Sequence, residues 1–386
     1  MSAMDPAVFS PDSKRDGTSA PKNDPTLSQV TSSHNIRRQG INLNHWYVLA
    51  RSFEVQAQPL GLTLWHQPIV LFRDTQGHIH ALEDCCPHRL VRMSHGIVAG
   101  DQLECAYHGW RFDATGRCSW VPHLAEHQKL PTCRLRRYPV REQDGFIWVF
   151  PGEPALAEQC SPLGMPEWED LNYIATVSSI DCPGHFSYLI ENLMDMHHGH
   201  LHQEFQAWAE ATLESLEESS TRVDAHYQAQ SYYRIDRMWS VAQLFIPALR
   251  QLHPEPLDVS YVYPHWMATL GQDFKIYCLF CPVHETQTRG YLIHFTSLNR
   301  FPELLYLPKW FRRFLKNRLF GAAQHLLDGL VKQDVQMIRD EQQAYLQHPE
   351  RRIYELNRAL VSVQRLIRTQ VNPSGESTIS SEVNLQ

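Results

Sequence analysis

Two short stretches, Cys86–His88 (Cys-Pro-His) and Cys105–Trp110 (Cys-Ala-Tyr-His-Gly-Trp), decide how the first half of this chain folds. Each stretch supplies one Cys–His pair, and sixteen residues separate the two pairs. Two thiolates and two imidazoles can surround one metal centre, and a structural zinc site uses the same ligand types. The pattern therefore predicts a metal centre held by two loops, with zinc as one candidate metal.

Short strand-like runs surround these stretches. Trp46–Ala50, Ile69–Phe72 and Phe146–Phe150 are rich in aromatic and aliphatic residues and are separated by turn residues, a texture typical of antiparallel strands. The sequence therefore predicts a small all-β domain that ends near Pro151 and carries the Cys–His pairs on loops between its strands.

The second half mixes strand and helix patterns. Phe274–Pro282 and Tyr291–Leu298, joined by residues 285–290, predict a hairpin in a second antiparallel sheet. Helices over Phe186–Gln203 and about Gly321–Leu346 flank that sheet. The expected fold class is α+β, with an N-terminal all-β domain followed by a larger α+β domain. The expected divisions are a disordered tail over 1–40, the all-β domain over 41–152, the α+β domain over 153–372 and a second disordered tail over 373–386.

A histidine-rich segment lies on the first predicted helix. From Asp195 to His202 it reads Asp-Met-His-His-Gly-His-Leu-His. Residues three, four and seven apart share a helix face, so Asp195, His198 and His202 would form one stripe. His197 and His200 would point elsewhere. The stripe predicts a second metal site with two imidazole ligands.

Asp334 is the candidate that completes the second site. Non-haem Fe(II) oxygenases combine two histidines with one carboxylate and keep other positions open for dioxygen and substrate. Leu330, Val331 and Ile338 fall at helical spacing around Asp334, which places its carboxylate on an apolar face. A carboxylate there is costly unless it is paired or bound to metal. A buried salt bridge with an arginine is the alternative.

The two Cys–His pairs resemble the Rieske centre, and the whole pattern over about Asn44–Gln343 resembles the oxygenase subunits of the Rieske non-haem iron oxygenases. By that resemblance Cys86 and Cys105 would hold one iron of a [2Fe-2S] cluster, and His88 and His108 would hold the other. The similarity is to the vanillate and dicamba demethylase and pheophorbide a oxygenase type, so the larger domain would be a catalytic domain.

The resemblance extends to the second site. The family follows Asn-x2-Asp-x2-His with a second His and places an Asp on a late helix, which implies a mononuclear Fe(II) held by His198, His202 and Asp334. Family members commonly have four residues between the two histidines, whereas this chain has three. His197 paired with His202 therefore stays open as the alternative, although helix periodicity favours His198.

The resemblance also implies partners. The family type forms a head-to-tail homotrimer, in which Asp195 would hydrogen-bond His108 across the interface and His198 within its own subunit. Electrons would come indirectly from NAD(P)H through a reductase or ferredoxin, and Trp110 is either the edge where that donor docks or a packing residue. The reaction would use dioxygen to oxidise a small organic substrate, aromatic or lipophilic, with monooxygenation favoured over dioxygenation.

Composition narrows the remaining possibilities. A net charge of −7 offers no basic field for nucleic acid. No apolar stretch reaches about 18 residues, and the first thirty residues lack the apolar core of a secretory signal, which predicts a cytoplasmic protein without a transmembrane segment. The nine cysteines are then expected to be reduced or metal-bound, with Cys85 a bystander and Cys278 and Cys281 buried thiols.

Two other classes compete with the oxygenase. A Rieske electron-transfer protein would leave about 230 residues and the second site unexplained, and a non-catalytic iron-binding sensor would keep the ligands without turnover. The substrate pocket is expected between Phe205 and Leu304. Its candidate aromatic residues are Trp208, Tyr232, Tyr233, Trp239, Phe245, Tyr261 and Tyr263.

Overall fold

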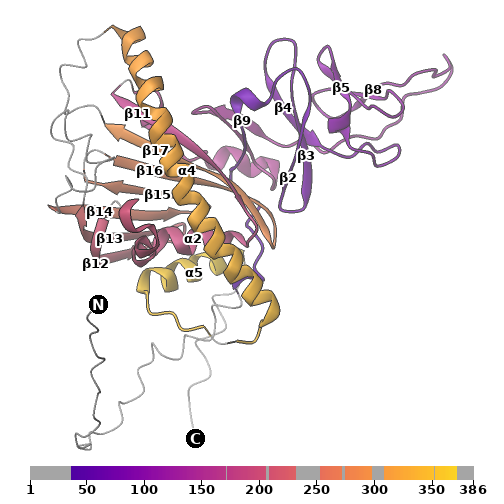
Figure 1. Ribbon diagram of the computed structural model, residues 1–386. Coiled ribbons are helices and arrows are strands. Elements are labelled where there is room, and N and C mark those ends of the chain that lie inside the picture. The colour runs from indigo at the N-terminus through magenta and orange to yellow at the C-terminus, as the bar shows by residue number, and fades with distance from the viewer. Residues whose placement is uncertain are drawn as a thin grey trace, which may run out of the picture.

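The computed structural model describes residues 36–170, 172–205, 208–231, 253–271, 274–297, 308–351 and 353–371. Most of the expected tails, residues 1–35 and 373–386, lies outside the described residues. The same holds for four candidate pocket residues, Tyr232, Tyr233, Trp239 and Phe245. The described chain folds as an all-β N-terminal domain beside a larger domain in which helices cover one sheet (Figure 1), so the predicted α+β class is confirmed.

The N-terminal domain consists of three small antiparallel sheets, ordered β1-β10-β9, β2-β3-β4 and β5-β6-β7-β8. The predicted strand-like run Ile69–Phe72 falls within β3, and the other two coincide with β1 and β10 to within one residue at their ends. The strands are β1 (Tyr47–Arg51), β2 (Leu60–Leu64), β3 (Gln67–Arg73), β4 (Ile79–Glu83), β5 (Ile97–Ala99), β6 (Gln102–Glu104), β7 (Arg111–Phe112), β8 (Cys118–Trp120), β9 (Val140–Gln143) and β10 (Phe146–Val149). Short 3-10 helices are η2 (Ser52–Glu54), η3 (Met93–His95), η4 (Pro154–Gln159) and η5 (Pro166–Trp168).

The larger domain is built on one seven-stranded antiparallel sheet, ordered β11-β17-β16-β15-β14-β13-β12. Its strands are β11 (Tyr173–Cys182), β12 (Trp208–Glu218), β13 (Arg222–Ser231), β14 (His253–Val262), β15 (His265–Leu270), β16 (Phe274–His284) and β17 (Gln287–Ser297). The predicted hairpin is confirmed as β16 and β17, which a turn of only Glu285 and Thr286 joins. The strand pairing continues to Gln287, opposite His284, so most of the expected loop is strand.

The helices of the larger domain pack on the sheet. They are α2 (Phe186–Met194), η6 (Met196–Phe205), α4 (Lys309–Gln347) and α5 (Arg358–Val371). The long helix α4 packs against β11 and crosses the sheet in Figure 1. It contains the predicted helix and begins twelve residues earlier. No helix within the described ranges combines the length and apolar character needed to cross a bilayer.

The predicted continuous helix over Phe186–Gln203 is wrong. The α-helix ends at Met194, Asp195 adopts an extended backbone with φ −94° and ψ 100°, and a 3-10 helix follows. The carboxylate of Asp195 accepts a hydrogen bond from the backbone N–H of His197 at 3.1 Å, which satisfies a donor at the start of the second helix in place of an α-helical bond. Local capping by this aspartate therefore overrides the helical periodicity.

The segment Ile36–Gly40 packs against the larger domain, although it falls within the range expected to be a tail. Ile36 is fully buried, and Arg37 forms an ion pair with Glu191 of α2. The Arg37 guanidinium also lies over the Tyr188 ring, 3.5 Å from its centroid. These tertiary contacts give the segment partners that its local composition does not reveal.

Candidate metal centres

The two Cys–His loops of the N-terminal domain share one backbone geometry. The N–H of Leu90 donates to the Cys86 carbonyl at 2.7 Å, and the N–H of Gly109 donates to the Cys105 carbonyl at 2.9 Å. Leu90 and Gly109 both have left-handed backbones, with φ of 57° and 66°. For Leu90 that conformation costs about 1–2 kcal/mol, and such strain is commonly found at functional sites. The two loops therefore hold their candidate ligands in the same backbone geometry.

The four candidate ligands converge between these loops. Cys86 and Cys105 are 1% and 2% exposed, and the imidazoles of His88 and His108 have ring centroids 4.5 Å apart. Burial, together with the neighbouring Cys105, raises the pKa of the Cys86 thiol to about 11. Metal binding is what converts such buried thiols to thiolates. Nδ1 of His88 is buried without a hydrogen-bond partner, as expected for an atom whose partner is a metal.

The spread of these ligands argues against a single zinc ion. Ligand atoms around a tetrahedral zinc lie about 3.3–3.8 Å apart for bonds of about 2.0–2.3 Å. Within the described ranges, only one group of three or more His, Cys, Asp or Glu ligand atoms falls within 4.8 Å of one another, and it lies in the other domain. A two-iron cluster, which separates its thiolate and imidazole ligands, fits the four residues better.

Trp110 stacks directly on a candidate ligand. Its indole is parallel to the His88 ring, with an interplanar angle of 4° and centroids 4.5 Å apart. Trp110 thus packs on this ring, in line with one of its two expected roles. Cys278 and Cys281 are 0% and 1% exposed, and burial raises the pKa of both thiols. The prediction that these two are buried thiols is confirmed.

His198, His202 and Asp334 form the second cluster, with one ligand atom from each lying within 4.8 Å of the others. The Nε2 atom of His202 is 3.4 Å from Oδ1 of Asp334, and the two imidazole rings are perpendicular with centroids 5.4 Å apart. The predicted set is thus brought together by η6 and α4. His197 stands outside it and is exposed.

Each histidine of this cluster has its Nδ1 atom occupied by a protein acceptor. Nδ1 of His198 contacts the backbone carbonyl of Asp195, and Nδ1 of His202 lies 2.9 Å from Oε1 of Gln333. An N–H donated by Nδ1 leaves the lone pair of Nε2 available for a metal. Sequence reasoning missed Gln333, because a glutamine beside a predicted ligand carries no spacing signal.

Asp334 is a mostly buried carboxylate with two imidazoles beside it. Its side chain is 16% exposed, and burial raises its pKa, opposed by the neighbouring His198 and His202. The side-chain amide of Asn192 in α2 donates to Oδ1 of Asp334 at 3.4 Å. No arginine pairs with this carboxylate among the described residues, so the buried salt bridge considered as an alternative is not formed there.

Asp195 does not contact His198 through its carboxylate. Its Oδ1 accepts from the backbone N–H of His197 and from Nδ2 of Asn357, both at 3.1 Å. The contact to His198 is made by the backbone carbonyl. Asn357 immediately precedes α5, and its partnership with Asp195 is a second feature that the sequence did not signal.

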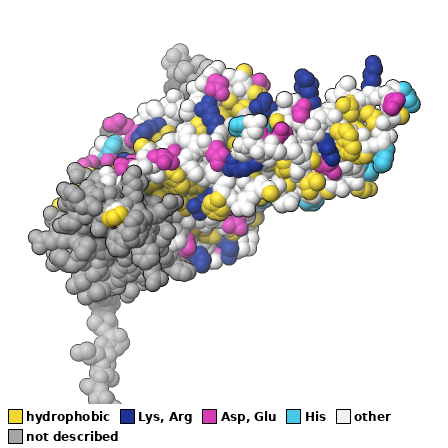
Figure 2. Space-filling view, turned by 90° about the horizontal axis from the view of Figure 1, so that it is seen from above, with side chains coloured by type: hydrophobic (Ala, Val, Ile, Leu, Met, Phe, Trp, Pro, Cys, Tyr) yellow, Lys and Arg dark blue, Asp and Glu magenta, His cyan; other side chains and the backbone are white. Residues whose placement is uncertain are grey.

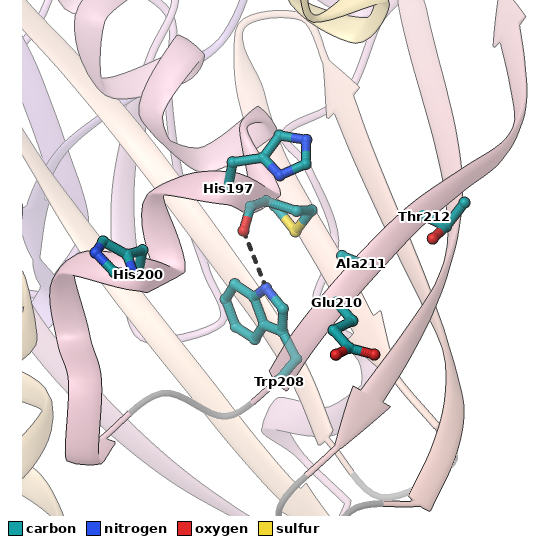
Figure 3. A pocket seen from close by; sticks show the side chains of 7 residues that line it. His197, His200, Trp208, Glu210, Ala211 and Thr212 are labelled. Atoms are coloured by element: carbon teal, nitrogen blue, oxygen red, sulfur yellow. Dashed lines mark hydrogen bonds between the residues drawn. The ribbon is translucent and has the colours of Figure 1, made fainter. Parts of the chain in front are cut away.

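A pocket of about 390 Å³ lies between η6 and β12, and Trp208, which lines it, has its ring centroid 6.3 Å from that of His198. In Figure 3, the side chains of His197 and His200 point in different directions and the Trp208 indole lies below both, with its N–H donating to the Met196 carbonyl at 3.2 Å. Trp208 therefore lines a pocket, whereas the other described candidates, Tyr261 and Tyr263, are 0% and 6% exposed and belong to the core.

Comparisons with known proteins agree with both centres. The family model of the Rieske [2Fe-2S] domain matches residues 45–139. The 4beta-methylsterol monooxygenase of Methylococcus capsulatus is 32% identical over 351 residues, which cover 88% of this chain and 91% of that protein. The chain belongs to the Rieske oxygenases. As an oxygenase alpha subunit, this Rieske oxygenase is an oxidoreductase that oxidises an organic substrate.

Further relatives are consistent with this family. The oxygenase component of dicamba O-demethylase from Stenotrophomonas maltophilia is 38% identical over 160 residues, which cover 40% of this chain and 45% of that protein. The crystal structure of dicamba monooxygenase bound to dicamba has a TM-score of 0.67 at 23% identity and covers 86% of this chain and 98% of that one. The Rieske oxygenase therefore shares the dicamba monooxygenase fold across both domains.

Proposed function

We propose that this Rieske oxygenase uses dioxygen and two electrons to hydroxylate a lipophilic organic substrate, with the electrons passed from NAD(P)H by a reductase or ferredoxin. The observation that carries the proposal is the convergence of His198, His202 and Asp334 from two separate elements. Two imidazoles and one carboxylate are the ligand set of non-haem Fe(II) oxygenases, which leaves positions open for dioxygen and substrate.

The chain itself supplies the positioning of both centres. Cys86 and Cys105 would hold one iron of the cluster, and His88 and His108 the other, with Trp110 fixing the plane of the His88 ring. When bound, the cluster would supply single electrons and the mononuclear iron would supply dioxygen activation. Asn192 and the acceptors on each Nδ1 atom hold the mononuclear ligands in one orientation.

The subunits are proposed to work as a homotrimer. In Figure 1 the strands β5 and β8, the outer strands of the sheet whose β6 and β7 flank the second cluster loop, lie at the end of the N-terminal domain away from α2 and α5, so a neighbouring subunit would provide the shorter path. Asp195 would bridge the two centres, since its backbone carbonyl already holds His198 and its carboxylate would accept from His108 of the next subunit.

Exposed apolar side chains on both surfaces support this docking. Leu356 is 93% exposed one residue before Asn357, the partner of Asp195, and Leu90 and Tyr107 on the cluster loops are 74% and 63% exposed. Figure 2 shows hydrophobic and histidine side chains gathered at the end of the molecule that the N-terminal domain forms. Exposed apolar surface of this kind marks interaction sites.

The substrate is proposed to be a methylsterol or a similarly lipophilic polycyclic compound, and the reaction a monooxygenation. Support comes from the 4beta-methylsterol monooxygenase, a relative whose similarity spans both domains. An aromatic O-methyl substrate is the second candidate, favoured by the dicamba O-demethylase similarity. All nine cysteines lie in the described ranges and none forms a disulfide, which supports action in the reducing cytoplasm.

The test measures substrate-dependent oxygen uptake with a generic reductase, a 4-methylsterol and vanillate. Oxygen uptake with the sterol, together with a hydroxylated product, is the expected result. Asp334→Ala should reduce this oxygen uptake more than 100-fold while leaving the Rieske absorption and paramagnetic signals unchanged. Cys105→Ser should remove those signals. Reduction of the cluster without oxygen uptake on either compound would rule out both proposed substrates.

Mixed assembly tests the proposed path between subunits. A Cys105→Ser chain and an Asp334→Ala chain, each inactive alone, should regain activity when they are assembled together, because each supplies the centre that the other lacks. Mixed trimers that form without recovering activity would rule out electron transfer between subunits.

A further inference from the structure

Gln333 is joined to the proposed iron site through a single contact. It immediately precedes Asp334 in α4, and its Oε1 atom lies 2.9 Å from Nδ1 of His202. His202 is 7% exposed, and its Nε2 atom points toward Asp334 at 3.4 Å. The same helix thus contacts both nitrogens of one imidazole, with the carboxylate on one side and the amide on the other.

This contact determines which nitrogen of His202 carries the proton. A neutral imidazole has one N–H donor and one lone-pair acceptor, and a metal needs the lone pair. An amide oxygen only accepts, so it holds the proton on Nδ1 and leaves Nε2 free to bind. The Nδ1 atom of His198 likewise contacts a backbone carbonyl, so a neutral acceptor lies at Nδ1 of both imidazoles.

We propose that Gln333 is a positioning residue that fixes the tautomer and ring orientation of His202 for metal binding. The inference rests on the proposed mononuclear site. Its neutral amide also distinguishes this site from carboxylate–histidine–metal arrangements, in which an anionic acceptor raises the basicity of the imidazole ligand. Gln333 therefore sets both the geometry and the donor strength of one ligand.

The test is a Co²⁺ titration of the full-length enzyme after selective removal of the mononuclear iron, with the Rieske spectrum as an internal check. Gln333→Leu removes the acceptor and should weaken Co²⁺ binding about 10- to 100-fold. Gln333→Glu keeps an acceptor that cannot donate, so it should bind Co²⁺ at least as tightly as the wild type and shift the ligand-field bands. Gln336→Leu, at another exposed glutamine about one turn along α4, should leave both readouts unchanged.

The glutamate variant separates the two possible orientations of the amide. If the NH₂ group donated to Nδ1, Gln333→Glu would lose Co²⁺ affinity as Gln333→Leu does, and that result would overturn the proposal. Wild-type affinity in Gln333→Leu would overturn it equally. His202→Ala identifies a different failure: if that variant also retains wild-type Co²⁺ binding and spectrum, the proposed ligand set is wrong rather than the role of Gln333.

Discussion

At the scale of the residue, His197 and His198 are neighbours with opposite surroundings. His198 contributes a ligand atom to the cluster with His202 and Asp334, whereas His197 is exposed and lines the pocket beside η6. The backbone N–H of His197 is nevertheless used, because it caps the 3-10 helix through Asp195. His198 thus contributes its side chain to the candidate metal site, and His197 contributes its backbone N–H to the helix cap.

This contrast predicts different outcomes for two alanine variants. His198→Ala should lose the mononuclear iron and reduce turnover by more than 100-fold, because the site keeps only one imidazole. His197→Ala should retain most of both, since only an exposed side chain is removed. Iron content per chain and oxygen uptake measure the two effects. The reverse pattern would mean that the ligands are His197 and His202, separated by four residues.

The sequence indicates the candidate ligands because their chemistry is unusual. It does not indicate the residues that hydrogen-bond to them. Two Cys–His pairs and a carboxylate on an apolar helix face stand out against ordinary composition. α-Helical periodicity predicts the pairing of His198 with His202, yet the segment is a 3-10 helix, so the two side chains come together through a local geometry other than the predicted one. Gln333 and Asn357 have common polar side chains whose roles depend on tertiary placement.

At the scale of the element, the segment Ile36–Gly40 acts as a strap across α2. Arg37 donates hydrogen bonds to Ser187 and Glu191, and Gln364 of α5 donates to the other oxygen of Glu191 at 2.9 Å. The side chains of Arg37 and Glu191 are 5% and 12% exposed. Because α2 also presents Asn192 to Asp334, the strap stabilises the helix that adjoins the proposed iron site.

Replacing Arg37, the cation of the strap, should therefore lower the free energy of unfolding. Arg37→Ala leaves the Glu191 carboxylate buried without its ion-pair partner, and losing one member of a buried pair costs about 3–5 kcal/mol. Urea unfolding should show a decrease of that order in the free energy of unfolding. The matched control is Arg365→Ala, whose ion pair with Glu218 is 53% and 38% exposed and should contribute less than about 1 kcal/mol. Equal effects of the two substitutions would contradict a structural role for the strap.

At the scale of the whole molecule, two buried histidines join the N-terminal segment to the larger domain. Nε2 of His185 donates to the Gln39 carbonyl and Nε2 of His265 donates to the Trp46 carbonyl, both at 3.0 Å. Their Nδ1 atoms accept from the backbone N–H groups of Ser187 and Phe280. Each imidazole must therefore be neutral to make both bonds, which links the junction between the domains to pH.

Burial lowers the pKa of His185 and of His265 to about 3 in the folded chain. At His185, the Gln39 carbonyl and Glu285 oppose this shift and Arg37 adds to it. At His265, His45 adds to the shift. In the unfolded chain both titrate near 6.5. The unfolded state therefore binds more protons below pH 6.5, so each histidine should cost the folded state about 1.4 kcal/mol for every pH unit between about 6.5 and 3.

The free energy of unfolding, measured in urea at pH 7.5, 6.5 and 5.5, should accordingly fall steeply only below pH 6.5. His265→Gln removes one titrating group while keeping a donor and an acceptor, so it should flatten that slope even if it lowers stability at pH 7.5. His226 is the control, because the hydrogen bond to Asp258 raises its pKa and acid should strengthen rather than weaken its contribution. His226→Gln should therefore leave the slope unchanged or slightly steeper. If His265→Gln keeps the full slope and His226→Gln flattens it, the acid sensitivity lies on the exposed surface of the sheet and not at the junction between the domains.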